Sequence, residues 1–230
     1  MQAAEIKQFL YDMGADLCGI ASAGRFGGAP EGFRPRDIFP PCRSVVVIAK
    51  KIPAGTLRCK TAVPYTVARN ILSAELDVLS VRFCAEMETR GVAAVPTGTI
   101  SPTRFDEKTG RWRGAVSAKH SAVAAGLGRI GKNTLLITPE YGNMVWLNVI
   151  LTDAELEPDG MLTGSPCEDD CSLCVDNCPA GALGESAMDQ NACFAHAFRT
   201  GANEEFTIKC HICRSVCPHC LGSKNGGRTL

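Results

Sequence analysis

The sequence lacks three features that would place it in a special class. It has no net charge, because 24 Lys and Arg residues are balanced by 24 Asp and Glu residues. It has no apolar run near the roughly 20 residues needed to cross a bilayer. Its N-terminus has no basic start followed by an apolar stretch, so we expect no secretory signal. These absences predict a protein without a membrane partner.

The composition itself is that of an ordinary globular protein. Hydrophobic residues make up 45% and charged residues 21% of the 230 residues, which is enough for a core in one or two domains. The charges are unevenly spread, since residues 1–166 carry 19 basic and 16 acidic side chains, whereas residues 167–230 carry 5 and 8. The C-terminal part is therefore the more acidic one.

Nine of the thirteen cysteines lie between residues 167 and 220: seven form two runs that each end in Cys-Pro, Cys193 lies between the runs, and Cys220 follows the second. Closely spaced cysteines closed by Cys-Pro are typical of bacterial ferredoxins, in which the cysteine before proline binds the other of two clusters. The pattern predicts two 4Fe-4S clusters, one held by Cys167, Cys171, Cys174 and Cys217 and the other by Cys193, Cys210, Cys213 and Cys178. Cys220 is left over.

Zinc binding and a disulfide scaffold are two other possible uses of the cysteines. Zinc also binds four cysteines in Cys-x2-Cys pairs, but it requires neither the Cys-Pro closure nor three closely spaced ligands in one half. A disulfide scaffold is disfavoured because the cysteine-free stretches are long enough to build a core. Reduced thiolate ligands in a chain without a signal indicate the cytoplasm.

The residue pattern predicts an α/β (α+β) N-terminal domain, residues 1–160, and a small ferredoxin-like domain, residues 161–230. Helices are expected at 6–13, 66–90 and 119–125, strands at 16–21, 44–49 and 92–95, a loop at 24–41, and a hairpin from 135–138 and 144–152. The β-branched run from Ser44 to Ala49 indicates a strand buried on both faces. Cys18, Cys42, Cys59 and Cys84 are expected to be buried or half-buried.

A glycine-rich stretch, Ala125-Gly-Leu-Gly-Arg-Ile-Gly-Lys-Asn-Thr134, resembles nucleotide-binding motifs only superficially. A P-loop has Ser or Thr after its lysine, where this chain has Asn133, and both nucleotide motifs follow a strand, whereas residues 120–125 indicate a helix. We therefore predict a helix C-cap followed by a tight turn. Its glycines would let the backbone approach another group closely.

The glycine stretch, the hydrophobic segment ending in Leu151-Thr-Asp153 and the cysteine runs together resemble the epoxyqueuosine reductase family and its wider group, which includes the reductive dehalogenases. Residues 14–21 and 41–47 are similar to the family's opening strands. The resemblance covers nearly the whole chain.

The resemblance implies an N-terminal domain that holds a cobalamin and a C-terminal domain that supplies it with electrons. It implies cofactor contacts at Gly128, Arg129, Lys132 and Asn133, and an electron-donor protein of the ferredoxin or flavodoxin type. The expected function is an iron–sulfur oxidoreductase acting on a small-molecule substrate. The alternative is an electron carrier or partner subunit without its own catalytic site.

The chain departs from the family at the acid that donates a proton. Aligned on the glycine turn, that position falls near Trp112 or Arg113, and the nearest acids are Asp106 and Glu107. No catalytic residue is therefore assigned. Because of this departure we expect no efficient reduction of epoxyqueuosine. The sequence also ends soon after the second Cys-Pro, without the C-terminal region that many family members use toward tRNA, so we expect no nucleic-acid partner.

The segment around this position is strongly basic. It contains seven cationic side chains against two acids: Arg104, Lys108, Arg111, Arg113, Lys119, Arg129 and Lys132. The segment could line a site for an anion or be a solvated loop, and the sequence favours neither. His120 has two interpretations as well, a proton donor or a residue on a helix surface.

Overall fold

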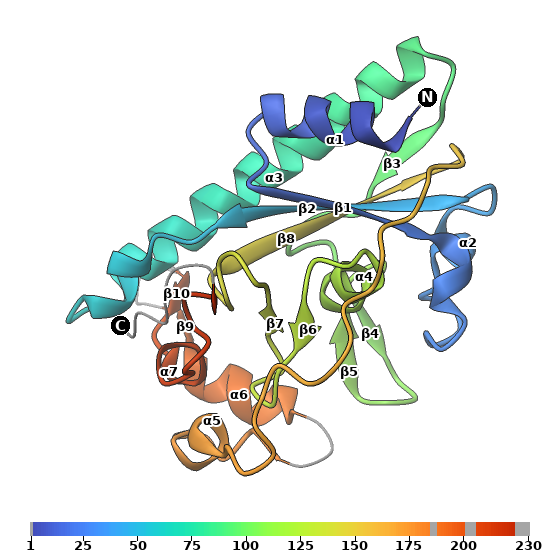
Figure 1. Ribbon diagram of the computed structural model, residues 1–230. Helices are drawn as coiled ribbons and strands as arrows, with labels where there is room; N and C mark the ends of the chain where they lie inside the picture. Colours follow the sequence, from blue (N-terminus) through green and yellow to red (C-terminus); the bar gives the residue numbers. More distant parts are fainter. Residues whose placement is uncertain (1, 185–187, 201–205, 224–230) are drawn as a thin grey trace. The chain divides into compact units, whose positions relative to one another are not determined.

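The computed structural model describes residues 2–184, 188–200 and 206–223 (Figure 1). The chain forms two compact units, the first from residues 1–50, 72–128 and 146–163 and the second from residues 51–71, 129–145 and 164–230. Each unit therefore takes most of its residues from one side of residue 160, but segments 51–71 and 129–145 group with the cysteine region. The predicted division at residue 160 stays a prediction. Parts of the predicted second domain, residues 185–187, 201–205 and 224–230, lie outside the described residues.

The elements follow one another along the described residues as helices and strands of very unequal length. The helices are α1 (Ala3–Asp12), α2 (Pro35–Ile38), α3 (Val63–Thr89), α4 (Ala118–Ala124), α5 (Leu173–Asp176), α6 (Gln190–Ala197) and α7 (Ile212–Ser215), with 3₁₀ turns at Ala23–Phe26 and Ala54–Arg58. The strands are β1 (Leu17–Ser22), β2 (Ser44–Lys51), β3 (Ala94–Pro96), β4 (Arg104–Asp106), β5 (Arg111–Arg113), β6 (Arg129–Ile130), β7 (Leu136–Ile137), β8 (Val145–Thr152), β9 (Phe198–Thr200) and β10 (Phe206–Ile208). Within the part of the chain that the structure describes, no helix combines the length and apolarity needed to cross a bilayer.

The first unit is built on a four-stranded sheet of order β1-β2-β8-β3. β1 and β2 pair antiparallel, with Leu17 opposite Ala49 and Ser22 opposite Ser44. Every residue from Val45 to Ala49 is fully buried, as expected of β-branched residues packed on both faces of a sheet. The predicted doubly buried strand is confirmed.

Two helices cover one face of this sheet, α1 and the part of α3 from Leu72 onward (Figure 1). Their buried side chains form one core with those of the strands, including Ile6, Leu10, Leu76, Phe83, Met87, Ile20, Val46, Ile48 and Ile150. Gly14 follows α1 with a φ of 100°, a conformation that favours glycine, and so terminates the helix as predicted.

The opposite face of the sheet is covered by α4, which packs against β1 (Figure 1). Gly19 of β1 makes this close packing possible, because a Cβ atom there would lie 2.5 Å from the carbonyl oxygen of Ala125. A glycine in a strand interior often marks such a close approach of two backbones. The glycine-rich stretch thus begins against the central sheet.

Three local predictions were wrong. The segments around residues 135–138 and 144–152 do not pair as a hairpin: β7 pairs with β6, whereas β8 joins β2 and β3, and only an isolated bridge between Thr138 and Gly142 closes the turn. The predicted loop at 24–41 contains the short helix α2, which Pro35 starts at a position where its missing N–H is not needed. Cys59 is exposed, whereas Cys18, Cys42 and Cys84 are buried as expected.

The second unit has little regular structure. Its strands form two-residue and three-residue ribbons, β6 with β7 and β9 with β10, and its helices α5 and α7 are each one turn long. The first turns of α3 anchor part of it, since the main-chain N–H of Ile208 donates to Thr66 Oγ1 at 3.0 Å. Because it has so few regular hydrogen bonds, the stability of this unit depends on turns and side-chain contacts, and a metal bound by the cysteines would add to it.

Candidate metal centres

A first group of cysteines lines one pocket in the second unit. The lining residues are Cys167, Cys171, Cys174 and Cys217 together with Lys132, Asn133, Leu173, Pro218 and His219. Cys174 lies on α5 and Cys217 follows α7, and these two short helices pack against each other. The structure thus brings the cysteine of the second Cys-Pro pair to the three cysteines of the first run.

The other four predicted ligands form a second group. The pKa of the Cys213 thiol is raised to about 11, chiefly by burial; Arg214 lowers it, and the neighbouring thiols of Cys210, Cys193 and Cys178 contribute to the rise. These neighbours come from α6, from the loop before α7 and from the first Cys-Pro pair. The structure therefore brings Cys178 to the later cysteines, although it is adjacent in sequence to the first run.

The thiols of the first group influence one another in the same way. Burial raises the pKa of Cys217, and the ionised forms of Cys167, Cys174 and Cys171 raise it further. Metals bind thiolates, so ligation at either group requires the loss of protons that these raised pKa values make costly. A positively charged metal centre would compensate for this cost.

Neither group has the spacing of ligands around one ion. Among the described residues no three His, Cys, Asp or Glu side chains are arranged to hold a single metal ion. Tetrahedral zinc needs four such ligands around one centre. A 4Fe-4S cluster is larger, and each thiolate binds a different iron atom, so its four sulfur ligands stand further apart.

The turn from Gly131 to Asn133 holds the first cysteine run. The main-chain N–H of Lys132 donates to Cys167 Sγ at 3.4 Å, and the ammonium of Lys132 donates to the carbonyl oxygens of Glu168, Asp169 and Cys171 at 3.2, 2.7 and 2.9 Å. A Cβ atom on Gly131 would lie 3.3 Å from Cys167 Sγ, so glycine allows this approach. The glycine-rich stretch does bring backbone close to another group, as predicted, and that group is a cysteine thiol.

The second cysteine run is held by two buried asparagines. The side-chain amide of Asn133 donates to the carbonyl oxygen of Cys213 at 3.1 Å, and that of Asn143 donates to the carbonyl oxygen of Arg214 at 3.2 Å. The main-chain N–H of Asn143 also donates to the carbonyl oxygen of Cys220 at 3.1 Å. Cys220 itself is 2% exposed, and burial raises its pKa to about 11.

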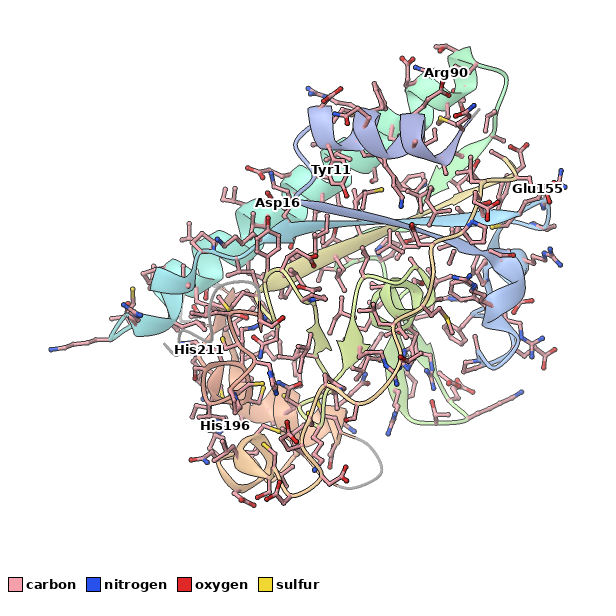
Figure 2. All side chains as sticks on the ribbon, viewed as in Figure 1. Tyr11, Asp16, Arg90, Glu155, His196 and His211 are labelled. Carbon is pink, nitrogen blue, oxygen red and sulfur yellow. The ribbon has the colours of Figure 1, made fainter. Side chains whose placement is uncertain are left out.

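Several polar atoms around the second run are buried without a partner. Among the described residues they include Arg214 Nη1, His211 Nδ1 and Asn143 Oδ1. The ring of His211, labelled in Figure 2, packs beside Tyr65 with the ring centroids 5.1 Å apart. Buried polar groups in native proteins nearly always have partners, so the unpaired donor Arg214 Nη1 suggests a nearby group that carries acceptor atoms, whereas Asn143 Oδ1 can only accept. A cluster with sulfide and thiolate sulfurs fits this requirement.

The start of the glycine-rich stretch is a helix cap, as predicted. Gly126 has a φ of 71° after α4, and the N–H groups of Gly126 and Leu127 donate to the carbonyl oxygens of Val123 and Ala122 at 3.0 and 2.9 Å. A Cβ atom on Gly126 would lie 2.2 Å from the carbonyl oxygen of Gly160. This glycine therefore serves packing, and the nucleotide-binding interpretation has no structural support here.

The four residues predicted to contact a corrinoid fall into two pairs. Lys132 and Asn133 have their side chains engaged with the cysteine runs, as described above. Gly128 follows the cap of α4, and Arg129 begins β6, opposite Ile137. The contacts of Lys132 and Asn133 do not support a corrinoid at these two side chains. Corrinoid contact by these four residues stays a prediction.

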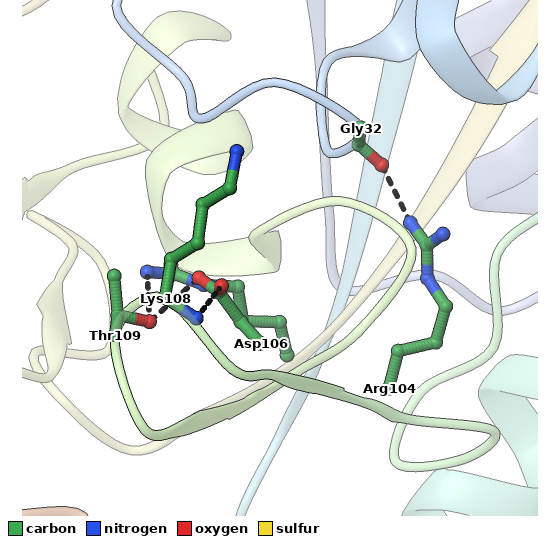
Figure 3. Close-up of polar contacts among 6 residues, drawn as sticks. Gly32, Arg104, Asp106, Lys108 and Thr109 are labelled. Atoms are coloured by element: carbon green, nitrogen blue, oxygen red, sulfur yellow. Dashed lines mark hydrogen bonds and ion pairs between the residues drawn. The ribbon is translucent and has the colours of Figure 1, made fainter.

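Residues 104–113 of the basic segment form a hairpin of β4 and β5 in the first unit (Figure 3). Asp106 lies at its centre and accepts hydrogen bonds from Thr109 Oγ1 at 2.6 Å and from Arg113 Nε at 2.8 Å. These two bonds lower the pKa of Asp106. A carboxyl group held in its ionised form is a poor proton donor, so Asp106 does not replace the acid that the family pattern implies.

Other cations of this segment also have structural contacts. Arg104 donates to the carbonyl oxygen of Gly32 at 2.5 Å, and its guanidinium lies 4.7 Å from the ring centroid of Phe33. His120 is exposed, and its Nδ1 is 2.7 Å from Ser117 Oγ. Desolvation, followed by Lys119 and Arg113, lowers the pKa of His120, which favours the neutral imidazole. The side chain of Trp112 is 56% exposed beside Phe105.

The sequence analysis missed three contributors to the cysteine sites: the ammonium of Lys132 as a clamp on the first run, Asn143, and Arg214. Their contacts link residues about 35 to 80 positions apart. Of these three residues, only Lys132 carried a signal in the sequence, through its place in the glycine-rich stretch beside Asn133, and that signal suggested a different ligand.

No family model matches the chain. Among characterised proteins, the chain is 37% identical over 122 residues to the epoxyqueuosine reductase of Listeria monocytogenes and 38% identical over 130 residues to that of Gloeobacter violaceus. The matches cover 47% and 50% of this chain but only 31% and 39% of those relatives. The chain is therefore homologous to less than half of each relative, and the predicted resemblance is confirmed at that level.

Solved structures extend the likeness to nearly the whole fold. An epoxyqueuosine reductase crystallised with an epoxyqueuosine-modified tRNA stem loop superposes with a TM-score of 0.63 at 21% identity, covering 99% of this chain and 66% of that one. A reductive dehalogenase studied for B12-dependent dehalogenation gives 0.66 at 18% identity, covering 93% and 31%. At such identities the likeness establishes the fold, and the predicted mixed helix and sheet architecture is confirmed.

The tRNA stem loop in the first of these structures bears on one expectation. It shows that a protein with this fold binds nucleic acid. The expectation that nucleic acid is not a partner of this chain therefore loses its support. The electron-donor partner stays a prediction.

Proposed function

We propose that this homologue of the epoxyqueuosine reductases is an iron–sulfur oxidoreductase with two 4Fe-4S clusters. Cys167, Cys171, Cys174 and Cys217 would hold the first cluster, and Cys193, Cys210, Cys213 and Cys178 the second. When bound, such clusters take up and release single electrons at potentials set by their surroundings. The proposal includes an electron donor of the ferredoxin or flavodoxin type and, because eight thiolates must stay reduced, a cytoplasmic location.

The observation that carries the proposal is the placement of the two Cys-Pro cysteines, which supports an exchange of ligands between the two groups. Cys217 lines the same pocket as Cys167, Cys171 and Cys174, and Cys178 influences the thiol of Cys213. Exchange of this kind is the arrangement of two-cluster ferredoxins. Two independent zinc sites would have no need of it, since each run could supply neighbouring ligands.

The residues around the first group suit a negatively charged centre. The main-chain N–H of Lys132 points at Cys167 Sγ, and the Lys132 ammonium fixes the three carbonyl oxygens of the following loop. Hydrogen bonds to ligand sulfur and nearby positive charge stabilise the more reduced state of such a centre. The chain's own role is thus to set ligand geometry and charge.

The substrate belongs to the first unit or to a partner of the chain. A small-molecule substrate was expected from the sequence, and the tRNA-bound relative adds modified tRNA as a second candidate. A corrinoid is the second cofactor we propose, on the strength of the B12-dependent dehalogenase with this fold. The alternative function, an electron carrier without its own catalytic site, is favoured by the absence of an acid at Trp112 or Arg113, where the family resemblance implies the proton donor.

One experiment separates these possibilities. Anaerobically purified protein should contain about eight iron and eight sulfide per chain, no stoichiometric zinc, and an absorption band in the visible region that dithionite bleaches. Corrinoid absorption beside that band, or its appearance after addition of cobalamin, would favour the enzyme over the carrier. Iron below about two per chain with one or two zinc ions would overturn the proposal.

A further inference from the structure

Arg214 is a charged side chain in an unusually buried place. It lies on α7 between Cys213 and Cys217 and is only 5% exposed. Among the described residues its Nη1 has no hydrogen-bond partner, and it takes part in no ion pair with a carboxylate. Its carbonyl oxygen accepts the hydrogen bond from Asn143, which fixes the turn that carries it.

An unpaired guanidinium in such a place needs an anion nearby. Arginine carries a permanent positive charge in proteins. A buried charge without a partner is strongly destabilising. The cysteine thiols are the anionic candidates beside it, since Arg214 directly follows Cys213 on α7 and Asn143 binds the carbonyl oxygens of both Arg214 and Cys220.

The first cysteine group has a different electrostatic environment. Its loop carries the exposed acids Glu168, Asp169 and Asp170, and the cation beside it, Lys132, is itself exposed. Exposed charges are screened by water, whereas a buried charge acts through a lower dielectric. The cation beside the first group is therefore exposed, whereas Arg214 is buried.

We propose that Arg214 raises the reduction potential of the cluster held by Cys178, Cys193, Cys210 and Cys213, so that this cluster takes up the first electron. This inference rests on the proposed function. Reduction adds one electron to the cluster and neither forms nor breaks a bond. The added negative charge is stabilised by the fixed guanidinium beside Cys213, so the reduced form gains more than the oxidised form.

The test is a potentiometric titration of the anaerobic holoprotein with dithionite, followed by electron paramagnetic resonance. Arg214→Gln should retain its iron and sulfide but show a lower midpoint potential for one cluster. Arg214→Lys should keep most of the wild-type value. The matched control is Lys209→Gln, which removes an exposed charge next to Cys210 and should leave both midpoints unchanged.

The outcomes separate this inference from the proposed function. Wild-type protein without clusters overturns the proposed function, whereas intact clusters with unchanged midpoints in Arg214→Gln overturn only the role of Arg214. If Arg214→Gln loses its clusters, the order in which the two clusters are reduced in the wild-type protein still tests the inference. On gradual reduction, the first signal to appear should be the one that Cys193→Ser alters. A first signal altered instead by Cys171→Ser contradicts the inference.

Discussion

The main-chain N–H of Lys132 donates a hydrogen bond of 3.4 Å to the Sγ atom of Cys167, across 35 residues of sequence. The next residue, Asn133, reaches the carbonyl oxygen of Cys213 in the other cysteine run. One short turn therefore contacts both runs. In a unit with so little regular structure, such contacts position the ligands before any metal is bound.

We expect the ammonium of Lys132 to slow the release of iron from the first cysteine group. Lys132→Met removes three hydrogen bonds to carbonyl oxygens and leaves the main-chain bond to Cys167 intact. Because the side chain is exposed, the loss should be about 1 kcal/mol. Iron release to an anaerobic chelator, followed by the absorbance of the chelate, should become roughly 5-fold faster for one of the two clusters.

The control for Lys132→Met is Lys60→Met, which removes an exposed lysine from the same unit. Its iron release should match that of the wild-type protein. Equal rates in Lys132→Met and the wild-type protein would show that the three carbonyl contacts do not hold the cysteine loop.

The first unit contains a buried polar network whose removal should cost stability without affecting the cysteines. Asn148 is fully buried, and its amide donates to Asp77 Oδ1 and Thr99 Oγ1, both at 2.9 Å. Asn148→Ala removes these bonds and should lower the free energy of unfolding by about 1–3 kcal/mol. Urea unfolding followed by circular dichroism measures this change.

The control for Asn148→Ala is Gln8→Ala, because Gln8 is an exposed amide of the same unit that also donates to a carboxylate, that of Asp12. Its effect should stay within about 0.5 kcal/mol. Similar losses in the two variants would mean that burial of the Asn148 network contributes little.

The helices and strands of the first unit could largely be predicted, because their signals are local. Local patterns of a few residues indicated the strand from Ser44 to Ala49, the helix α3 and the capping glycine Gly126. The pairing of β7 and β8 could not be predicted in the same way. Both segments are apolar and flank a turn, yet their partners are chosen by the rest of the sheet.

The membership of the cysteine sites stays a prediction from the cysteine spacing, and the residues that support these sites could not be predicted. The spacing of the cysteines indicated the exchange of Cys178 and Cys217, and the pocket contains Cys217 as that pattern requires. The clamp by Lys132 and the burial of Arg214 have no local signature, since both depend on segments distant in sequence. A lysine in a glycine-rich turn suggests a phosphate or a cofactor before it suggests a loop of carbonyl oxygens.

The hairpin of β4 and β5 should open at acidic pH through Asp106. The hydrogen bonds from Thr109 and Arg113 hold the pKa of Asp106 below its ordinary value of 3.8. For a lowered carboxyl pKa, the stabilisation is fully present above the ordinary value and is lost as the pH falls through the folded value. Trp112 fluorescence in a Trp146→Phe background should therefore change only below about pH 4.

Two variants check this assignment. Asp106→Asn should give the open-hairpin fluorescence throughout the pH range, because an amide lacks the charge that holds Arg113. Glu107→Gln changes the adjacent, exposed acid and should keep the wild-type transition. A wild-type transition in Asp106→Asn would assign the pH dependence to another group.

Under the proposed function, the Cys-Pro cysteine of each run binds the cluster of the other run. Cys217→Ser should perturb the cluster of Cys167, Cys171 and Cys174, whose pocket it lines, although Cys213 is its nearer neighbour in sequence. Its electron paramagnetic resonance spectrum should then lose the same signal as Cys171→Ser, with about half of the iron lost.

Cys178→Ser should in turn lose the same signal as Cys193→Ser, because its thiol belongs to the second group. The control is Cys220→Ala, since Cys220 is buried, and its carbonyl oxygen rather than its thiol accepts the bond from Asn143. That variant should keep both signals and all of its iron. If Cys217→Ser removed the signal that Cys193→Ser removes, each run would hold its own cluster, because the Cys-Pro cysteine would then serve its neighbours in sequence instead of crossing to the other group.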